Sequence, residues 1–223
     1  MKAFPSILVC AAIVVSCGIP ALAQSTFRPA RVTFATDVQF PITSIASGIV
    51  VVDVSIDSKG AVTGTAVQRD IASLTSVATS AVRDWKYTPA YLDGTPQPSV
   101  LRVAFAFRPR AIMAAPPSFA PLQQDDGIQG SKSGYIPPEI LAVAYPAYPI
   151  DAASVGAVAV QLRVNADGKI DNLKIIRAFP PFTRFSLDAA KKWQFRPATL
   201  NREPVASNIA IAFVYATPAV SYR

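Results

Sequence analysis

The side chains that most often carry catalysis or bind metals are nearly absent from this sequence. It contains no histidine, and its two cysteines, Cys10 and Cys17, lie close to the N-terminus. Serine–histidine and cysteine–histidine nucleophiles, common zinc sites and dithiol redox centres are therefore excluded. The remaining candidates are carboxylates, which we expect to be solvated structural groups at turns, on strand exteriors and in a helix: Asp53, Asp57, Asp70, Asp167, Asp171 and Asp188. The sequence predicts no catalytic residue, no metal site and no cofactor.

An internal duplication organises the chain. At an offset of 108 residues (193 minus 85), Trp85 aligns with Trp193 and Gly60 with Gly168 without a gap. A repeat of this length indicates one supersecondary unit folded twice. We assign the first repeat to residues 27–109, the second to 135–218, and a Pro/Gly/Ser-rich linker to 110–134.

The N-terminus has the features of an export signal. Residues 1–23 combine Lys2, a short apolar run and Ala21-Leu22-Ala23, a small-residue cleavage pattern. We expect cleavage near Ala23 and a periplasmic or secreted product without a stable membrane span. An alternative is lipidation at Cys17, which follows a lipobox-like run.

Basic residues outnumber acidic ones, 21 to 14. The surplus is spread thinly, and the densest run is Lys191-Lys192. This pattern favours a solvated basic surface in an anionic envelope and does not favour nucleic-acid binding.

Within each repeat, alternating apolar residues predict a strand with one buried face. Residues 50–56 and 158–164 show this alternation, with Gln161 and Arg163 on the opposite side. Turns ending at Gly60 and Gly168 follow, where glycine supplies a left-handed conformation. Residues 62–69 and 170–177 then return as the second strand of a hairpin.

A helix and a final strand complete each repeat. Alanines and aromatic residues recur at three- and four-residue spacing: Ala78, Ala81, Val82 and Trp85, and Phe185, Ala189, Ala190 and Trp193. We expect both tryptophans in the core. The fold class is therefore α+β, with two tandem β-β-α-β domains, each a small three-stranded antiparallel sheet packed against one helix.

The motif that follows each helix resembles a known family. Trp193-Gln194-Phe195-Arg196-Pro197-Ala198, preceded by Gly168, is similar to the C-terminal domain of TonB-like energy transducers, and Trp85 to Ala90 with Pro89 repeats the pattern. The resemblance covers nearly all of the predicted mature chain. TonB-type transducers also have an uncleaved membrane helix and a long Pro-rich rod, which we do not expect here, so only the docking module is carried over.

The resemblance implies a non-enzymatic periplasmic domain that receives an extended segment of an outer-membrane receptor as an added strand. That segment would pair with the last strand of the sheet, at residues 99–108 and 207–216. The implied binding positions are Ser99, Leu101, Val103, Phe105, Ser207, Ile209, Ile211 and Phe213. The implied structural positions are Gly60, Trp85, Pro89, Gly168, Trp193 and Pro197.

Three functions therefore remain open. The first is capture of a protein partner in the cell envelope by β-strand addition, with a link to TonB-type transport. The second is a structural envelope protein, such as a homodimer, that uses its sheet edges for self-association. The third is a hydrolase that relies on carboxylates.

Overall fold

The computed structural model describes residues 26–41, 44, 46–109, 119–121, 134–148 and 154–216. The predicted signal segment 1–23, with Cys10 and Cys17, lies outside these ranges, as does most of the predicted linker.

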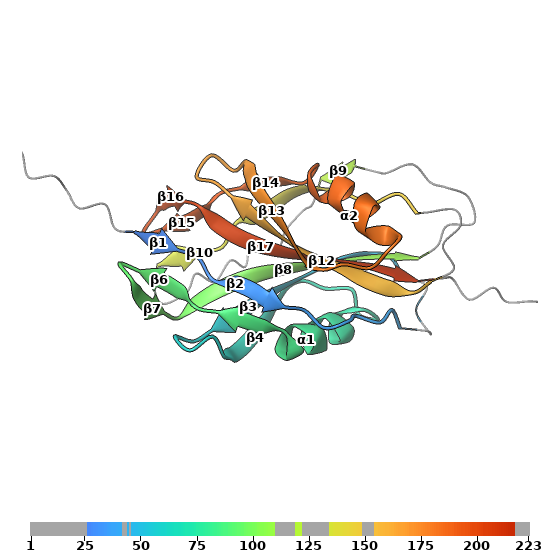
Figure 1. The fold of residues 1–223 in the computed structure, drawn as a ribbon, viewed down its shortest axis with the longest axis horizontal. Coiled ribbons are helices and arrows are strands. Elements are labelled where there is room, and N and C mark those ends of the chain that lie inside the picture. Colours follow the sequence, from blue (N-terminus) through green and yellow to red (C-terminus); the bar gives the residue numbers. More distant parts are fainter. Residues whose placement is uncertain are drawn as a thin grey trace, which may run out of the picture.

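Each repeat contains one α-helix among short and long strands (Figure 1). The first repeat comprises β1 (Phe27–Arg28), β2 (Arg31–Phe34), β3 (Gly48–Ile56), β4 (Val62–Arg69), α1 (Thr75–Asp84), β5 (Lys86–Thr88), β6 (Ala90–Leu92), β7 (Thr95–Gln97) and β8 (Ser99–Pro109). The second comprises β10 (Tyr135–Ile136), β11 (Glu139–Ala144), β12 (Gly156–Val164), β13 (Ile170–Arg177), α2 (Phe182–Ala190), β14 (Gln194–Arg196), β15 (Ala198–Leu200), β16 (Glu203–Val205) and β17 (Ser207–Ala216). The predicted order of hairpin, helix and last strand is present in both.

Part of the predicted linker is ordered against the second repeat. Strand β9 (Phe119–Pro121) pairs antiparallel with β11, which also pairs with β14. The linker region thus contributes a strand to a small three-stranded sheet.

The β3–β4 turn shows why the motif requires Gly60 and how that glycine lies against Pro89. Gly60 has φ +88°, and a Cβ there would lie 2.6 Å from the Tyr87 carbonyl oxygen and 3.5 Å from Pro89. Gly168 repeats this arrangement against Phe195 and Pro197. Glycine is required both for the left-handed backbone and for the close approach of the strand that follows the helix.

Asp57 completes the same turn. Its Oδ1 accepts hydrogen bonds from the backbone N–H groups of Lys59 and Ala61, both at 2.8 Å, and these bonds lower the pKa of the carboxyl. Asn165 makes the equivalent bonds in the second repeat. Turn stabilisation therefore accounts for this aspartate, as the sequence predicts.

The two repeats form one continuous six-stranded sheet instead of two separate sheets. Its strand order is β13-β12-β17-β8-β3-β4, and every pairing is antiparallel except that of β17 with β8, which is parallel. Each three-stranded antiparallel half matches the predicted unit. The two predicted sheets are joined into one, because the last strands of the two repeats pair with each other.

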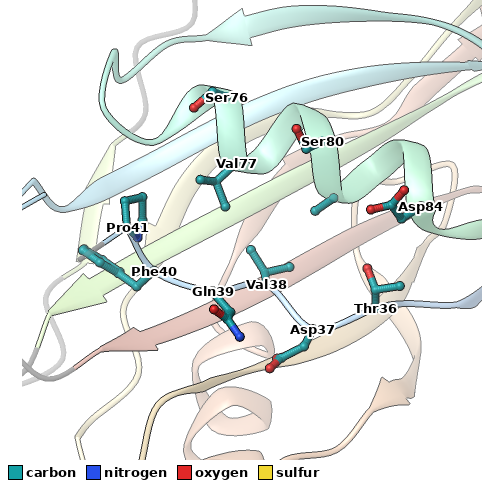
Figure 2. A pocket seen from close by; sticks show the side chains of 11 residues that line it. Thr36, Asp37, Val38, Gln39, Phe40, Pro41, Ser76, Val77, Ser80 and Asp84 are labelled. Atoms are coloured by element: carbon teal, nitrogen blue, oxygen red, sulfur yellow. The ribbon is translucent and has the colours of Figure 1, made fainter. Parts of the chain in front are cut away.

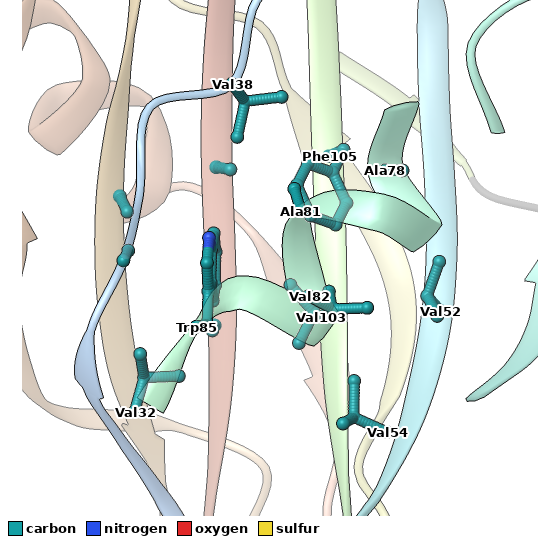
Figure 3. Close-up of a cluster of buried hydrophobic side chains, with 14 of the residues drawn as sticks. Val32, Val38, Val52, Val54, Ala78, Ala81, Val82, Trp85, Val103 and Phe105 are labelled. Atoms are coloured by element: carbon teal, nitrogen blue, oxygen red, sulfur yellow. The ribbon is translucent and has the colours of Figure 1, made fainter. Parts of the chain in front are cut away.

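Both faces of this sheet are buried, so the prediction of a single buried face is wrong. The α1 side buries Val52, Val54 and Phe105, together with Trp85 from the helix end (Figure 3). The α2 side buries the intervening residues Ile49 and Val51 of the same strand β3. Figure 1 shows the sheet between α1 and α2, an arrangement that follows from a parallel central pair flanked by two related halves.

The N-terminal segment of each repeat extends this cover onto the other repeat. Val32 and Val38 belong to the core cluster that also contains Ala157 and Ala212 of the second repeat. On the opposite face, Ile140 and other residues of β11 share a cluster with first-repeat alanines. Alanines on these strands leave room for the crossing segment.

Both tryptophans are in the core as expected, with Trp85 2% and Trp193 3% exposed. One predicted helix contact differs. Phe182, the first residue of α2, is fully buried, whereas Phe185 is only half-buried. The predicted positions Ala189, Ala190 and Trp193 are buried as expected, and Phe182 takes the place of Phe185 in the buried stripe.

The β15–β16 turn offers a test of backbone strain. Asn201 and Arg202 both have positive φ, 51° and 72°, whereas the equivalent turn in the first repeat uses Asp93 and Gly94. Arg202→Gly should stabilise the fold by roughly 0.5–1 kcal/mol, because arginine is strained in the left-handed region. Urea unfolding measures this difference. Gly94→Arg is the matched control and should destabilise, since a Cβ there meets nothing within 4 Å and only backbone strain changes; equal stability of all three proteins would contradict the interpretation.

Candidate functional site

The strands expected to form free binding edges lie side by side at the centre of the sheet. Strand β8 pairs with β3 on one side and with β17 on the other, and the parallel ladder runs from Arg102↔Ile209 to Pro109↔Ala216. The expected binding residues Val103, Phe105, Ile209, Ile211 and Phe213 lie within this ladder. Ser99, Leu101 and Ser207 lie just outside it but are also buried. The expectation that these strands are free edges is therefore wrong.

Large and small side chains alternate across this central pair. On the α1 side, Val103 and Phe105 face Ala210 and Ala212. On the α2 side, the sizes are reversed, with Ile211 and Phe213 facing Ala104 and Ala106. All eight side chains are at most 1% exposed. This complementarity lets both faces of the parallel pair pack at the density of a protein interior.

A buried ion pair lies next to the central pair. Arg102 is 0% exposed, and its Nε and Nη2 donate to the two carboxylate oxygens of Asp53 at 2.7 and 2.8 Å. Its Nη1 donates to the Pro138 carbonyl oxygen of the second repeat at 3.1 Å. Asp53 was expected to be solvated; instead it holds the guanidinium that links the repeats, which is how a buried charge avoids a large desolvation cost.

The second repeat makes the reciprocal link with neutral groups. Asn208 Nδ2 donates to the Ala30 carbonyl oxygen at 2.9 Å, and Gln161 Oε1 accepts the Val32 N–H at 2.8 Å. Ala30 is the residue that aligns with Pro138 at the repeat offset. The N-terminal segment of each repeat is therefore held by polar side chains of the other.

The outer edges of the sheet are β4 and β13. Within the described residues, β4 pairs with β3 alone and β13 with β12 alone, and each edge strand carries two register shifts at equivalent places. Bulges of this kind bend an edge strand locally, and between the two shifts the register runs unbroken, over residues 52–55 and 160–163. Val67 and Ile175 align at the repeat offset and are 43% and 41% exposed, so each edge presents one apolar side chain.

A groove of about 550 Å³ lies between residues 36–41 and α1 (Figure 2). Val38, Phe40 and Val77 contribute apolar surface, while Ser76, Ser80 and Asp84 contribute polar groups. Asp37, at its other side, forms an ion pair with Arg177 at 3.2 Å. The lining therefore combines apolar side chains with hydroxyl and carboxylate groups.

In the described ranges, no three Asp or Glu side chains are grouped so that they could hold a metal ion. Neither α1 nor α2, the helices in the described part of the chain, is long and apolar enough to cross a membrane. The features that distinguish this surface are its strand edges and grooves.

The architecture is that of two related α+β domains joined edge to edge through their last strands. The sequence matches the Gram-negative bacterial TonB protein C-terminal family over residues 44–109 and again over 142–217. These two matches together include more than half of the chain, which therefore belongs to this family as a tandem pair. The family consists of non-catalytic, periplasmic protein-interaction domains. No curated protein matches the chain.

The residues that join the repeats were missed at the sequence level, although signals existed. Arg102 and Asp53 are charges at the middle of strongly apolar strands, which is typical of a buried pair. Alanines alternate with large residues in both last strands. That alternation indicates that the second face of the sheet is also buried against closely packed chain. A sheet with one face in water would not need alanines there.

The buried ion pair predicts a large and specific effect on stability. Arg102→Ala should lower the free energy of unfolding by about 3–5 kcal/mol, because it leaves the Asp53 carboxylate buried without a partner. The double variant Asp53→Gln/Arg102→Ala, which places the aligned residues of the second repeat at these positions, should be less destabilised than Arg102→Ala alone. Urea unfolding measures both.

The matched control removes an exposed ion pair. Arg163 and Asp171 lie 3.4 Å apart with side chains 46% and 42% exposed. Asp171→Ala should therefore change stability by less than about 1 kcal/mol. A similar loss for Asp171→Ala and Arg102→Ala would show that the buried pair has no special role.

Three buried tyrosines predict a loss of stability at alkaline pH. Burial raises the pKa of Tyr135 to about 12 and raises the pKa of Tyr87 and Tyr215 further above the ordinary value. Their hydroxyls contact Ser207, the Val82 carbonyl oxygen and Ser186, respectively. The folded state keeps these protons while the unfolded state loses them, so stability is fully present below about pH 10 and falls as pH rises above it.

Urea unfolding between about pH 8 and pH 11.5 measures how the free energy of unfolding depends on pH. Above about pH 10 it should fall by about 1.4 kcal/mol per pH unit for each tyrosine that stays protonated in the folded state. Tyr135→Phe should make the slope shallower. A constant midpoint across the range would contradict the predicted titration.

Proposed function

We propose that this chain is a non-enzymatic protein-interaction module of the cell envelope in which each TonB C-terminal domain occupies the last-strand edge of the other. The observation that carries this proposal is the parallel pairing of β8 with β17. In this arrangement the two domains act as one rigid body, and extended segments of envelope partners add as strands at the outer edges β4 and β13. A link to TonB-type transport would act through such a partner.

Several features support docking at the outer edges. Every second N–H and C=O of an edge strand points away from the sheet, so an extended chain can pair with it without a particular side-chain sequence. Val67 and Ile175 add an exposed apolar contact at equivalent places on the two edges. Docking at Val103 or Ile211 would instead require the central pair to separate, which exposes both apolar faces to water.

Self-association through the same edges is the second candidate. The pairing of β8 with β17 is itself an association between two domains of this family. Pairing of β4 or β13 between two copies would extend the sheet and give a structural envelope dimer. Light scattering of the purified mature protein separates the candidates, since a monomer leaves both outer edges open.

Site-specific photo-crosslinking tests the docking proposal in the producing cell. Val67→p-benzoylphenylalanine, and separately Ile175→p-benzoylphenylalanine, should give crosslinks to envelope proteins, with the crosslinked site lying in an extended segment of the partner. Mass spectrometry of the linked peptides identifies that segment. The edge positions tolerate the large side chain because they are already exposed.

The control position is Val155, which is 53% exposed and lies outside both edge strands. It should give few of the same products. Equal crosslinking of one partner from Val155 and from the edge positions would indicate non-specific contact, and crosslinks only to a second copy of the chain would support self-association instead.

A further inference from the structure

A second groove, of about 620 Å³, lies beside the outer edge β4 and is lined by positive charge. Lys59 comes from the β3–β4 turn, Arg83 from the last turn of α1 and Lys86 from β5. The backbone at Val62 to Gly64, where β4 begins, forms one wall. Three different elements therefore bring cations to one side of a strand edge.

These cations are not neutralised by ion pairs within the described part of the chain. Arg83 reaches β4 itself, with Nη2 at 3.4 Å from the Thr65 hydroxyl. Asp57 interacts electrostatically with Lys59, but its Oδ1 accepts hydrogen bonds from two backbone N–H groups of its own turn, and it does not line the groove. Asp84 lines the other groove, beside residues 36–41. The groove thus keeps a positive excess.

The other outer edge differs in charge. At the repeat offset, Lys59 and Lys86 align with Asp167 and Gln194, and only Arg83 aligns with another cation, Lys191. Strand β13 also contains Asp171, which pairs with Arg163, whereas β4 contains no acidic residue between Val62 and Arg69. The duplication has therefore produced two edges with the same backbone geometry and different electrostatics.

We infer that the β4 edge binds an extended acidic segment of an envelope protein, with Asp or Glu at alternate positions. The inference rests on the strand addition proposed above and specifies its partner. Alternate side chains of an added strand point to the same face of the sheet, about 7 Å apart. Those on the α1 face extend over the groove, where Lys59, Arg83 and Lys86 meet their carboxylates, while the segment's backbone pairs with β4.

The experiment uses the whole mature chain and two synthetic peptides of about ten residues. One alternates glutamate with valine, and the other replaces each glutamate with glutamine. Fluorescence anisotropy should give about 5- to 30-fold tighter binding of the glutamate peptide at about 20 mM salt, as expected for several exposed ion pairs. The difference should shrink at about 500 mM salt.

Matched charge variants locate the effect. The triple variant Lys59→Gln/Arg83→Gln/Lys86→Gln should bind both peptides equally, and all three side chains are exposed, so the fold should be retained. The control Lys169→Gln/Lys174→Gln/Lys191→Gln removes the same charge near β13 and should keep most of the preference. Loss of the preference in both triple variants would indicate attraction by net charge alone and would overturn the inference.

Hydrogen exchange separates this inference from the proposed function. The glutamate peptide should slow amide exchange within residues 62–69 and leave residues 170–177 unchanged. Equal binding of the glutamine peptide at β4 would overturn the charge inference and leave strand addition standing. Binding of the glutamate peptide without slower exchange in β4 would also overturn it, because only a surface ion pair would remain. If neither peptide alters exchange at either edge, both proposals fail.

Discussion

The parallel pairing of β8 with β17 is the constraint on which the rest of this structure depends. A parallel pair between two related halves places one helix on each face of the sheet, so neither face can remain in water. Each face then needs cover over the half that its own helix does not reach. The N-terminal segments of the repeats supply that cover. The segment of the first repeat lies before its family match, which begins at residue 44, whereas β11 of the second repeat runs into its match, which begins at residue 142. In the first repeat, the joint therefore combines strands of the family match with chain that precedes it.

The local structure was largely predictable from sequence. The hairpins, both helices, the last strands and the core tryptophans follow from periodicity and turn chemistry, which act over a few residues. The joining of the two sheets was not predictable. Main-chain pairing needs no particular side chains and therefore leaves little trace in a sequence. The same reason explains why β9 was assigned to a linker: three residues, Phe119–Pro121, carry too little pattern to indicate a strand.

The site predictions were limited by the same cause. In an isolated repeat, the last strand would pair with one neighbouring strand and would be an edge. The prediction of binding edges at these strands is therefore reasonable for a single repeat. In the tandem chain the last strand of the other repeat is the second neighbour, and pairing buries apolar residues that a free edge would expose. Burial of large residues against alanines makes the joined state the more stable one. Among the described strands of the six-stranded sheet, those left with an unpaired outer side are β4 and β13, which is why the proposed docking is placed there.

The two repeats meet the same structural demand with different chemistry, and this difference bears on function. The carbonyl groups of Pro138 and Ala30 are both held across the joint, one by the charged Arg102 and the other by the neutral Asn208. Because each crossing segment is held by the other repeat, neither repeat keeps its full core when it is separated from its partner. The outer edges β4 and β13 are then held at opposite edges of one sheet. A substitution that changes the charge of one edge does not require the same change on the other. If both outer edges receive strands as proposed, the duplicated domain presents two unlike edges on one continuous sheet.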